Sequence, residues 1–362
     1  MSYLGRMPEP LNPKLRHHRP AARPATAAEW VARLRGGDDR RALGQAITLL
    51  ESNRPADRAL ADALIDELSG AAPPAQRPAS SFRLGVSGTP GVGKSTFIER
   101  FGAEVLGRGH RLAVLAVDPS SSLSGGSILG DKTRMEELSR NPAAFIRPSP
   151  TGGHLGGVGA ASRAAVLLCE AAGYDYVIVE TVGVGQAEWR VHSMTDAFLL
   201  LAQPAAGDEL QGIKRGILEL ADVIAVNKAD RLAAAAKQTA LELRRGLHLA
   251  PARPDGWTVP VTRISGLTGE GLPDLYDRLA TYRSRRVSSG DFAARRAAQQ
   301  LSWLRERCEH ELQRQLTEHL DALGRTTGGL RRILDEHSTV TTAANAILAD
   351  FHQQQSTKTT SE

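Results

Sequence analysis

A glycine-rich run that ends in lysine and serine is the strongest chemical signal in the 362-residue sequence. A predicted strand (83–87) precedes it and a predicted helix (96–106) follows it, which is the context that makes the pattern a P-loop. In a P-loop, backbone N–H groups and the positive end of the helix bind phosphates. We expect Lys94 to contact the β- and γ-phosphates and Ser95 to ligate magnesium. The complete run that we expect to surround the phosphates is Gly88, Thr89, Pro90, Gly91, Val92, Gly93, Lys94, Ser95 and Thr96.

Three acidic residues could complete the metal site. Glu180 lies near the end of an apolar run (176–182), where a carboxylate has little structural use unless it faces a cation or a donor. Asp118 closes another apolar run, and Asp131 follows a Ser/Gly-rich segment that resembles a switch folding over the γ-phosphate. For Asp118 or Asp131 alone, a helix cap or turn residue remains an alternative. The predicted magnesium ligands are Ser95, Asp118, Asp131 and Glu180, and the Gly183 N–H is expected at the γ-phosphate.

A second motif indicates which base is bound. Asn227, Lys228 and Asp230 follow the apolar run 223–226. The Asp230 carboxylate can accept hydrogen bonds from guanine N1–H and the exocyclic amine, whereas adenine offers an acceptor at N1 and no such amine. Downstream of a P-loop, this motif predicts GTP rather than ATP. After the last strand, a further base contact is expected from Ser265, Gly266 and Leu267.

The elements that must position these residues are an alternation of short apolar runs and helical stretches. Near-continuous apolar runs are typical of parallel strands covered by helices on both faces. We therefore predict an α/β fold with a doubly wound, mostly parallel sheet that binds its ligand at the carboxyl ends of the strands. The predicted strands are residues 83–87, 112–117, 176–182, 197–202, 223–226 and 259–264.

Helical regions flank this core, which we place at residues 81–285. Residues 27–80 form the predicted N-terminal helical region, with apolar side chains every three or four positions and a Pro/Ala-rich linker near its end. In the C-terminal region (286–352), leucines from Leu301 to Leu323 form one apolar stripe. Packing on the chain's own core and dimerisation explain this stripe equally well. The polar tails 1–26 and 353–362 are predicted to be disordered.

Composition excludes several other classes. The formal net charge of +5 arises mainly from a Pro-rich basic tail, and aromatic residues make up only 4%, so we do not expect nucleic-acid binding. Two distant cysteines offer neither a disulfide framework nor metal-ligand spacing. Because no apolar stretch approaches the length of a membrane span, we expect a cytoplasmic protein without membrane insertion.

Several longer runs resemble the MeaB/ArgK-type G proteins. They include Asp118-Pro-Ser-Ser-Ser, Gly125-Gly-Ser-Ile-Leu-Gly-Asp131, Glu180-Thr-Val-Gly-Val-Gly-Gln186 and Gly207-Asp-Glu-Leu-Gln-Gly-Ile-Lys214. The resemblance implies a SIMIBI-like P-loop NTPase fold and a homodimeric GTPase. It also implies a chaperone that gates adenosylcobalamin loading and protects or reactivates a B12-dependent acyl-CoA mutase, chiefly methylmalonyl-CoA mutase.

The resemblance also assigns roles to individual residues. It implies a partner-facing switch at residues 205–214, with Gln211 and Lys214 as its contact candidates. The family usually has Ser-Ala where this chain has Ser265 and Gly266. Phosphoryl transfer requires that the reacting groups be positioned and their charge neutralised. We predict Lys94 and Glu180 as catalytic residues. Asp131 and Gln186 are the alternatives for positioning the attacking water.

Two other functions remain as alternatives. A nickel-delivery GTPase should carry Cys/His ligand clusters, for which His17 and His18 are the only hint. An older label of the family is a kinase of an arginine/ornithine transport system. Such a kinase would need an acceptor-substrate pocket and a base, and the sequence offers no pattern for either.

Overall fold

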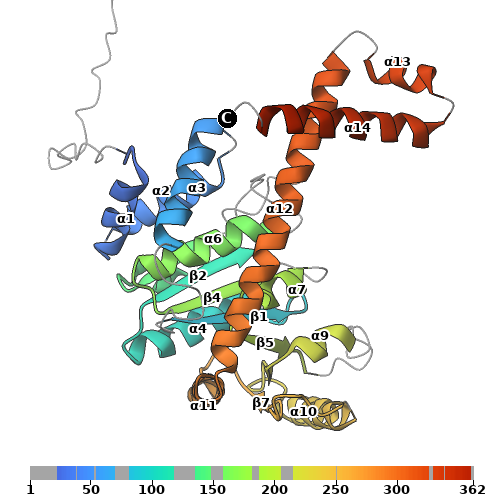
Figure 1. The fold of residues 1–362 in the computed structure, drawn as a ribbon. Coiled ribbons are helices and arrows are strands. Elements are labelled where there is room, and N and C mark those ends of the chain that lie inside the picture. Colours follow the sequence, from blue (N-terminus) through green and yellow to red (C-terminus); the bar gives the residue numbers. More distant parts are fainter. Residues whose placement is uncertain are drawn as a thin grey trace, which may run out of the picture.

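The computed structural model describes residues 23–37, 39–52, 54–69, 81–117, 135–147, 158–181, 187–204, 215–249, 251–325, 329–337 and 339–359. Within these ranges seven strands form one sheet in the order β3-β2-β4-β1-β5-β6-β7. Every neighbouring pair is parallel. The predicted α/β class with a parallel, doubly wound sheet is therefore confirmed (Figure 1).

The strands match the apolar runs closely, with one addition. The additional strand, β3, pairs only with β2 at the edge of the sheet, and its four residues end in a partly exposed arginine rather than forming a continuous apolar run. The last strand is shorter than the predicted run 259–264. The bounds are β1 Phe82–Gly88, β2 Leu112–Val117, β3 Ala144–Arg147, β4 Tyr176–Thr181, β5 Ala197–Ala202, β6 Val223–Val226 and β7 Val261–Arg263.

Helices cover both faces of the sheet because alternate strand residues face opposite sides. In β2, Ala113 and Leu115 pack in one apolar cluster, whereas Leu112 and Val114 pack in another. The first face is covered by α6 (Val158–Ala171), α7 (Ala187–His192), α9 (Arg215–Leu220) and α10 (Ala233–His248). The second face is covered by α4 (Lys94–Gly107), α5 (Glu136–Arg140) and α11 (Leu272–Ser288).

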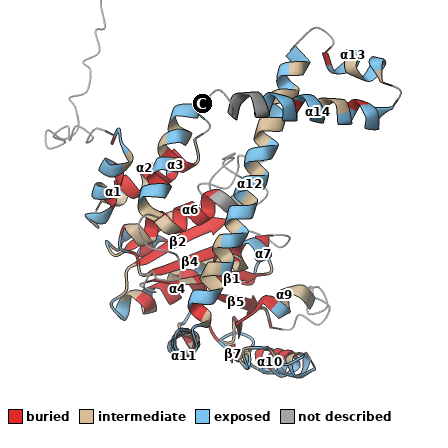
Figure 2. Ribbon diagram, in the orientation of Figure 1, coloured by how far each residue is buried: buried red, intermediate tan, exposed pale blue. Residues whose placement is uncertain are grey.

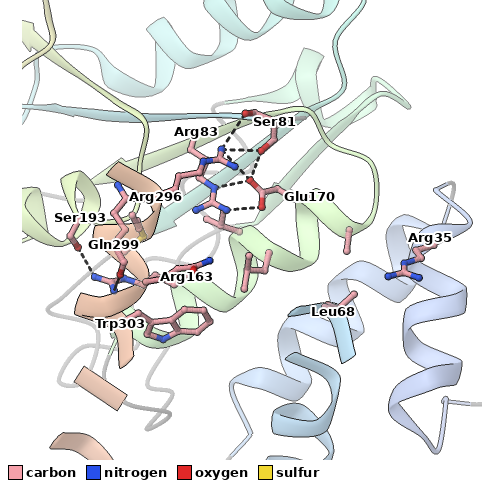
Figure 3. A pocket seen from close by; sticks show the side chains of 15 residues that line it. Arg35, Leu68, Ser81, Arg83, Arg163, Glu170, Ser193, Arg296, Gln299 and Trp303 are labelled. Carbon is pink, nitrogen blue, oxygen red and sulfur yellow. Dashed lines mark hydrogen bonds and ion pairs between the residues drawn. The ribbon is translucent and has the colours of Figure 1, made fainter. Parts of the chain in front are cut away.

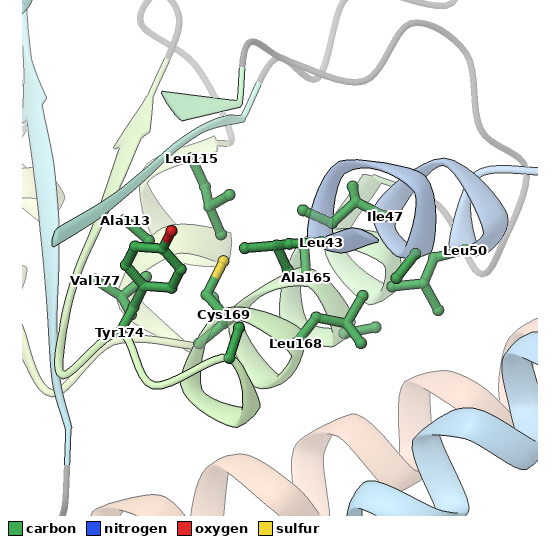
Figure 4. Close-up of a cluster of buried hydrophobic side chains, with 14 of the residues drawn as sticks. Leu43, Ile47, Leu50, Ala113, Leu115, Ala165, Leu168, Cys169, Tyr174 and Val177 are labelled. Atoms are coloured by element: carbon green, nitrogen blue, oxygen red, sulfur yellow. The ribbon is translucent and has the colours of Figure 1, made fainter. Parts of the chain in front are cut away.

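Three N-terminal helices pack on α6, and the end of α2 also pairs with the edge strand through Glu51 and Arg147. They are α1 (Ala27–Arg35), α2 (Arg40–Leu50) and α3 (Pro55–Ser69). A capping box starts α1, since Thr26 accepts a hydrogen bond from the Glu29 N–H while the Glu29 carboxylate accepts one from the Thr26 N–H. The apolar stripe of α2 meets α6 in one buried cluster that includes Cys169 (Figure 4). The helical N-terminal region that the sequence predicted is confirmed.

The C-terminal region is a long helix with two shorter helices at its far end (Figure 1). These are α12 (Asp291–Arg325), α13 (Gly329–Glu336) and α14 (Val340–Thr359). Helix α14 extends to Thr359, so the prediction of a disordered tail from residue 353 is wrong for most of that segment. None of the described helices has the length and apolarity needed to span a bilayer.

The predicted apolar stripe of α12 is largely exposed in the single chain. Leu301 and Leu304 are 70% and 62% exposed, and Leu312 is also exposed. Figure 2 shows the outer part of α12 as mainly exposed, beyond the end that contacts the core. Packing on the chain's own core therefore does not bury this stripe.

Helix α12 is anchored at its base by an ion pair. Two nitrogens on one edge of the Arg296 guanidinium donate to the buried Asp196 carboxylate, Nε to Oδ1 at 2.8 Å and Nη2 to Oδ2 at 2.7 Å. Asp196 also accepts a hydrogen bond from the Arg83 N–H of β1. Through this carboxylate the long helix α12 is bonded to the amino ends of the central strands β1 and β5.

We predict that Arg296→Ala lowers the free energy of unfolding by about 3–5 kcal/mol, because it leaves Asp196 buried without its partner. Arg314→Ala is the matched control on the same helix. Arg314 pairs with two partly exposed carboxylates, and its loss should cost less than ~1 kcal/mol. Urea denaturation followed by circular dichroism measures both, and equal effects would contradict the anchoring role of Arg296.

Candidate nucleotide-binding site

The P-loop lies between the end of β1 and the start of α4, as the sequence predicts. Gly93 has a φ of 95°, a left-handed conformation that L side chains rarely adopt. A Cβ atom at this position would also lie 3.0 Å from the Asn227 side-chain nitrogen. The turn into α4 therefore requires glycine for both its backbone angle and its contact with the neighbouring loop.

Lys94 turns back over this loop. Its Nζ donates hydrogen bonds to the carbonyl oxygens of Gly88 and Thr89, at 2.8 and 3.4 Å. Burial lowers the pKa of the Lys94 ammonium, while the carboxylates of Glu180 and Glu188 act to raise it. The lysine expected at the phosphates is thus half-buried, and among the described residues the opposing charges that act on it are these two acids.

Glu180 is buried, with 5% of the residue exposed. On β4 it lies in register with Val86 of β1 on one side and Ala116 of β2 on the other. This register places it between the strand that leads into the P-loop and the strand that leads toward Asp118. A buried carboxylate here fits a divalent cation, and Ser95 in the first turn of α4 would supply a hydroxyl ligand.

One buried amide joins the phosphate motif to the base motif. Asn227 Nδ2 donates to the Val92 carbonyl oxygen at 2.8 Å, and Asn227 Oδ1 accepts from the Gly266 N–H at 2.8 Å. The Ser265 hydroxyl accepts from the Thr268 N–H at 3.0 Å and so holds the turn after β7. Three loops from distant parts of the sequence are therefore fixed to one side chain.

Lys228 crosses the P-loop in an unusual conformation. It is the one non-glycine residue of the described chain with positive φ, at 59°. Its Nζ donates to the Gly91 carbonyl oxygen at 2.7 Å and lies 3.4 Å from Gln203 Oε1. This strained backbone brings the aliphatic stem of Lys228 alongside the loop and lets Asp230 follow on the same turn, where a base could be read.

The glycine of the Ser265-Gly266 pair after β7 has a steric reason. A Cβ atom at Gly266 would lie 3.0 Å from Cα of Phe97 in α4, closer than ordinary contacts. Glycine therefore allows this turn to approach the P-loop helix. Leu267 beside it is 54% exposed.

The structure brings together the predicted residues at the ends of β1, β4, β6 and β7. The remaining predicted residues lie outside the described ranges, and their roles stay predictions. They are Asp118, Asp131, Gly183, Gln186, Gln211 and Lys214.

The sequence interpretation missed Glu188. This residue of α7 is fully buried, and its carboxylate acts on the pKa of Lys94. It stands next to Trp189, which is 63% exposed. One sequence signal could have indicated Glu188. It is an acidic residue between an alanine and a tryptophan, in a helix that follows a strand.

Fold and site together define a P-loop nucleotide-binding protein, and comparison with known proteins gives its activity and family. The family model described as "Methylmalonyl Co-A mutase-associated GTPase MeaB" matches residues 43–321. The chain belongs to this family and is a GTPase that binds GTP. The resemblance stated from the sequence motifs is thereby confirmed.

Individual relatives agree with this assignment. A putative GTPase of Caulobacter vibrioides is 54% identical over 267 residues, 74% of this chain and 80% of that protein. The GTPase ArgK of Escherichia coli is 45% identical over 293 residues, 80% of this chain and 85% of that protein. A solved structure described as LAO/AO transport system kinase superposes with a TM-score of 0.67 and 35% identity, covering 91% of this chain and 98% of the other.

We predict that Asp230→Asn shifts nucleotide preference from GTP toward XTP, because the amide matches the xanthine oxygen where the carboxylate matches the guanine amine. A competition assay between labelled GTP and XTP measures the change, which should exceed ~10-fold if a charge-assisted bond is lost. Asp274→Asn, on an exposed helix surface, is the control. Unchanged preference in Asp230→Asn would remove this base assignment.

We predict that Glu180→Ala slows magnesium-dependent GTP hydrolysis by ~100-fold or more while GDP stays bound, because a buried carboxylate suited to the cation is lost. Hydrolysis at increasing magnesium concentration and binding of a fluorescent GDP analogue separate the two effects. Turnover equal to that of the wild type would show that Glu180 does not act at the metal.

Proposed function

We propose that this GTPase is a magnesium-dependent chaperone of a cobalamin-dependent acyl-CoA mutase, with methylmalonyl-CoA mutase as its partner. In this proposal it gates adenosylcobalamin loading and protects or reactivates the mutase. The family association with methylmalonyl-CoA mutase supports the choice of partner. A mouse relative, 48% identical over 275 residues, is described as a methylmalonic aciduria type A homolog.

One observation on α7 carries the regulatory part of the proposal. Two consecutive residues point to opposite environments, since Glu188 is fully buried beside the Lys94 site and Trp189 is 63% exposed. A short helix that contacts the site on one side and solvent on the other can pass a change at the phosphates to a bound protein. Tryptophan is also the side chain most enriched at binding hot spots.

We further propose that the protein is a cytoplasmic homodimer in which a second copy covers the exposed leucines of α12. Burial of this stripe would remove an apolar surface that the single chain leaves in water.

The nickel-delivery alternative lacks a matching site in the described part of the chain. No cluster of three or more His, Cys, Asp or Glu side chains suited to a metal cargo occurs among the described residues.

We predict that the mutase stimulates GTP hydrolysis by the wild-type protein, and that Trp189→Ala loses most of this stimulation while its own hydrolysis rate is unchanged. Leu249→Ala, an 89% exposed residue at the end of α10, is the control and should respond like the wild type. GTP turnover with and without the mutase, together with adenosylcobalamin transfer, gives the readout. Analytical ultracentrifugation of the same samples should show dimers.

Wild-type protein that neither binds the mutase nor is stimulated by it in any nucleotide state would refute the proposed partner. Stimulation that survives in Trp189→Ala would refute the role of α7 alone.

A further inference from the structure

The connection between β4 and β5 joins the nucleotide site to the base of the long helix α12. From the carboxyl end of β4 the chain passes over β1 as α7, and residues 193–196 then lead into the amino end of β5. We call residues 193–196 the exit segment. Because α7 runs from one end of the strands toward the other, its two ends lie near different parts of the molecule.

The middle of α7 lies directly on β1 at a glycine. A Cβ atom at Gly85 would lie 2.8 Å from Val191 Cγ1 and 2.9 Å from Thr195 Oγ1, closer than real Cβ atoms approach. The Thr195 hydroxyl in turn donates to the Val191 carbonyl oxygen at 2.8 Å, so the exit segment is bonded to the helix before it. Helix and strand are in close contact, and α7 can therefore move along β1 or away from it but not toward it.

The first turn of α7 lies toward the nucleotide site. Glu188 stands three residues before Val191 and so on the same side of the helix, one turn closer to the carboxyl end of β1. It is fully buried, and its carboxylate acts on the pKa of the Lys94 ammonium. A γ-phosphate bound at Lys94 would bring additional negative charge toward this carboxylate. Like charges repel more strongly where water is excluded, so GTP and GDP should act differently on α7.

The exit segment is bonded to the base of α12. The Thr195 carbonyl oxygen accepts hydrogen bonds from Gln299 Nε2 at 2.8 Å and from Arg295 Nε at 3.1 Å. The next residue, Asp196, forms the ion pair with Arg296 described above. Two consecutive residues of the exit segment are thus joined to about one turn of α12.

The start of the exit segment is held as well. The Ser193 hydroxyl accepts a hydrogen bond from Arg163 Nη2 of α6 at 2.6 Å (Figure 3), and the same nitrogen donates to Glu306 Oε1 of α12 at 3.0 Å. Arg163 is buried, so this bridge is shielded from water. A displacement of the exit segment must therefore stretch its bonds to α12 or move the helix with it.

We propose that α7 and the exit segment couple the nucleotide state of the GTPase to the position of α12. GTP repels the Glu188 carboxylate, α7 moves away from β1, and the Thr195 carbonyl oxygen is drawn from its two donors on α12. GDP lacks the γ-phosphate and leaves these bonds in place. The base of α12 is therefore held less firmly in the GTP-bound state. This regulation lies within the GTPase itself and goes beyond the mutase partnership.

The wild-type protein gives the first test. Hydrogen exchange of the full-length protein, followed by mass spectrometry, is compared at saturating GDP and at a saturating non-hydrolysable GTP analogue, both with magnesium. The amides of the exit segment and of residues 295–303 should exchange faster with the analogue. Those of α10, which packs on β6 and β7, are the internal control and should exchange equally in both states. Equal exchange at the base of α12 would overturn the proposal.

A substitution at the base of α12 gives the second test, because coupling between two sites is reciprocal. Gln299→Ala removes one donor to the exit segment and should raise the affinity for the GTP analogue relative to GDP by ~3-fold or more. Gln238→Ala is the matched control, since Gln238 bonds to Glu242 of its own helix α10, and it should leave the ratio unchanged. Competition with a fluorescent GDP analogue measures both affinities.

A ratio that is unchanged in Gln299→Ala, or that shifts toward GDP, would also overturn the proposal. The exchange experiment decides the question if this variant fails to fold, because it uses the wild-type chain. Both measurements are made without the mutase, so neither outcome bears on the proposed partner.

Discussion

The two hydrogen bonds of the Asn227 side chain fix the geometry on which the nucleotide site depends. This amide is buried and holds the P-loop at Val92 and the turn after β7 at Gly266. Because a buried hydrogen bond is costly to leave unmade, the phosphate end and the base end of the site cannot move independently. The predicted guanine contact of Asp230 and the predicted phosphate contact of Lys94 therefore belong to loops that are bonded to one another.

Because the sheet is parallel, few side-chain contacts are needed to assemble the nucleotide site from distant parts of the sequence. The sheet brings the carboxyl ends of β1, β4 and β6 to one edge, so residues separated by more than a hundred positions meet without long side chains. Glu180 needs only its register between β1 and β2 to reach the lysine site. At the amino ends of the strands, Asp196 joins the C-terminal region to the sheet by pairing with Arg296 of α12.

The sequence was sufficient for the features with strong local patterns. The P-loop, the Asn227 motif and six strands were predicted because each combines a distinctive composition with a fixed order. β3 was missed because it pairs on one side only and ends in a partly exposed arginine, so it lacks the continuous apolar run of the equally short internal strand β6. The disordered tail was predicted from polar composition, yet α14 continues through much of it.

Other features depend on tertiary contacts that a single sequence does not display. The burial of Glu188, the positive φ of Lys228 and the close approach of Gly266 to Phe97 all arise from loops that meet only in the folded chain. The exposed leucines of α12 were predicted as a stripe, but their lack of a cover within the chain could be seen only in three dimensions.

Helix α12 has a mechanical consequence. With 35 residues it is about 50 Å long, and its first half is held to the core by the pairs Arg296–Asp196, Glu306–Arg163 and Arg307–Asp62. The part beyond Arg307 is about 27 Å long, so a tilt of about 5° at its base would move its far end by roughly 2 Å. A small rearrangement of the core would thus be enlarged at α13 and α14, which lie at that far end.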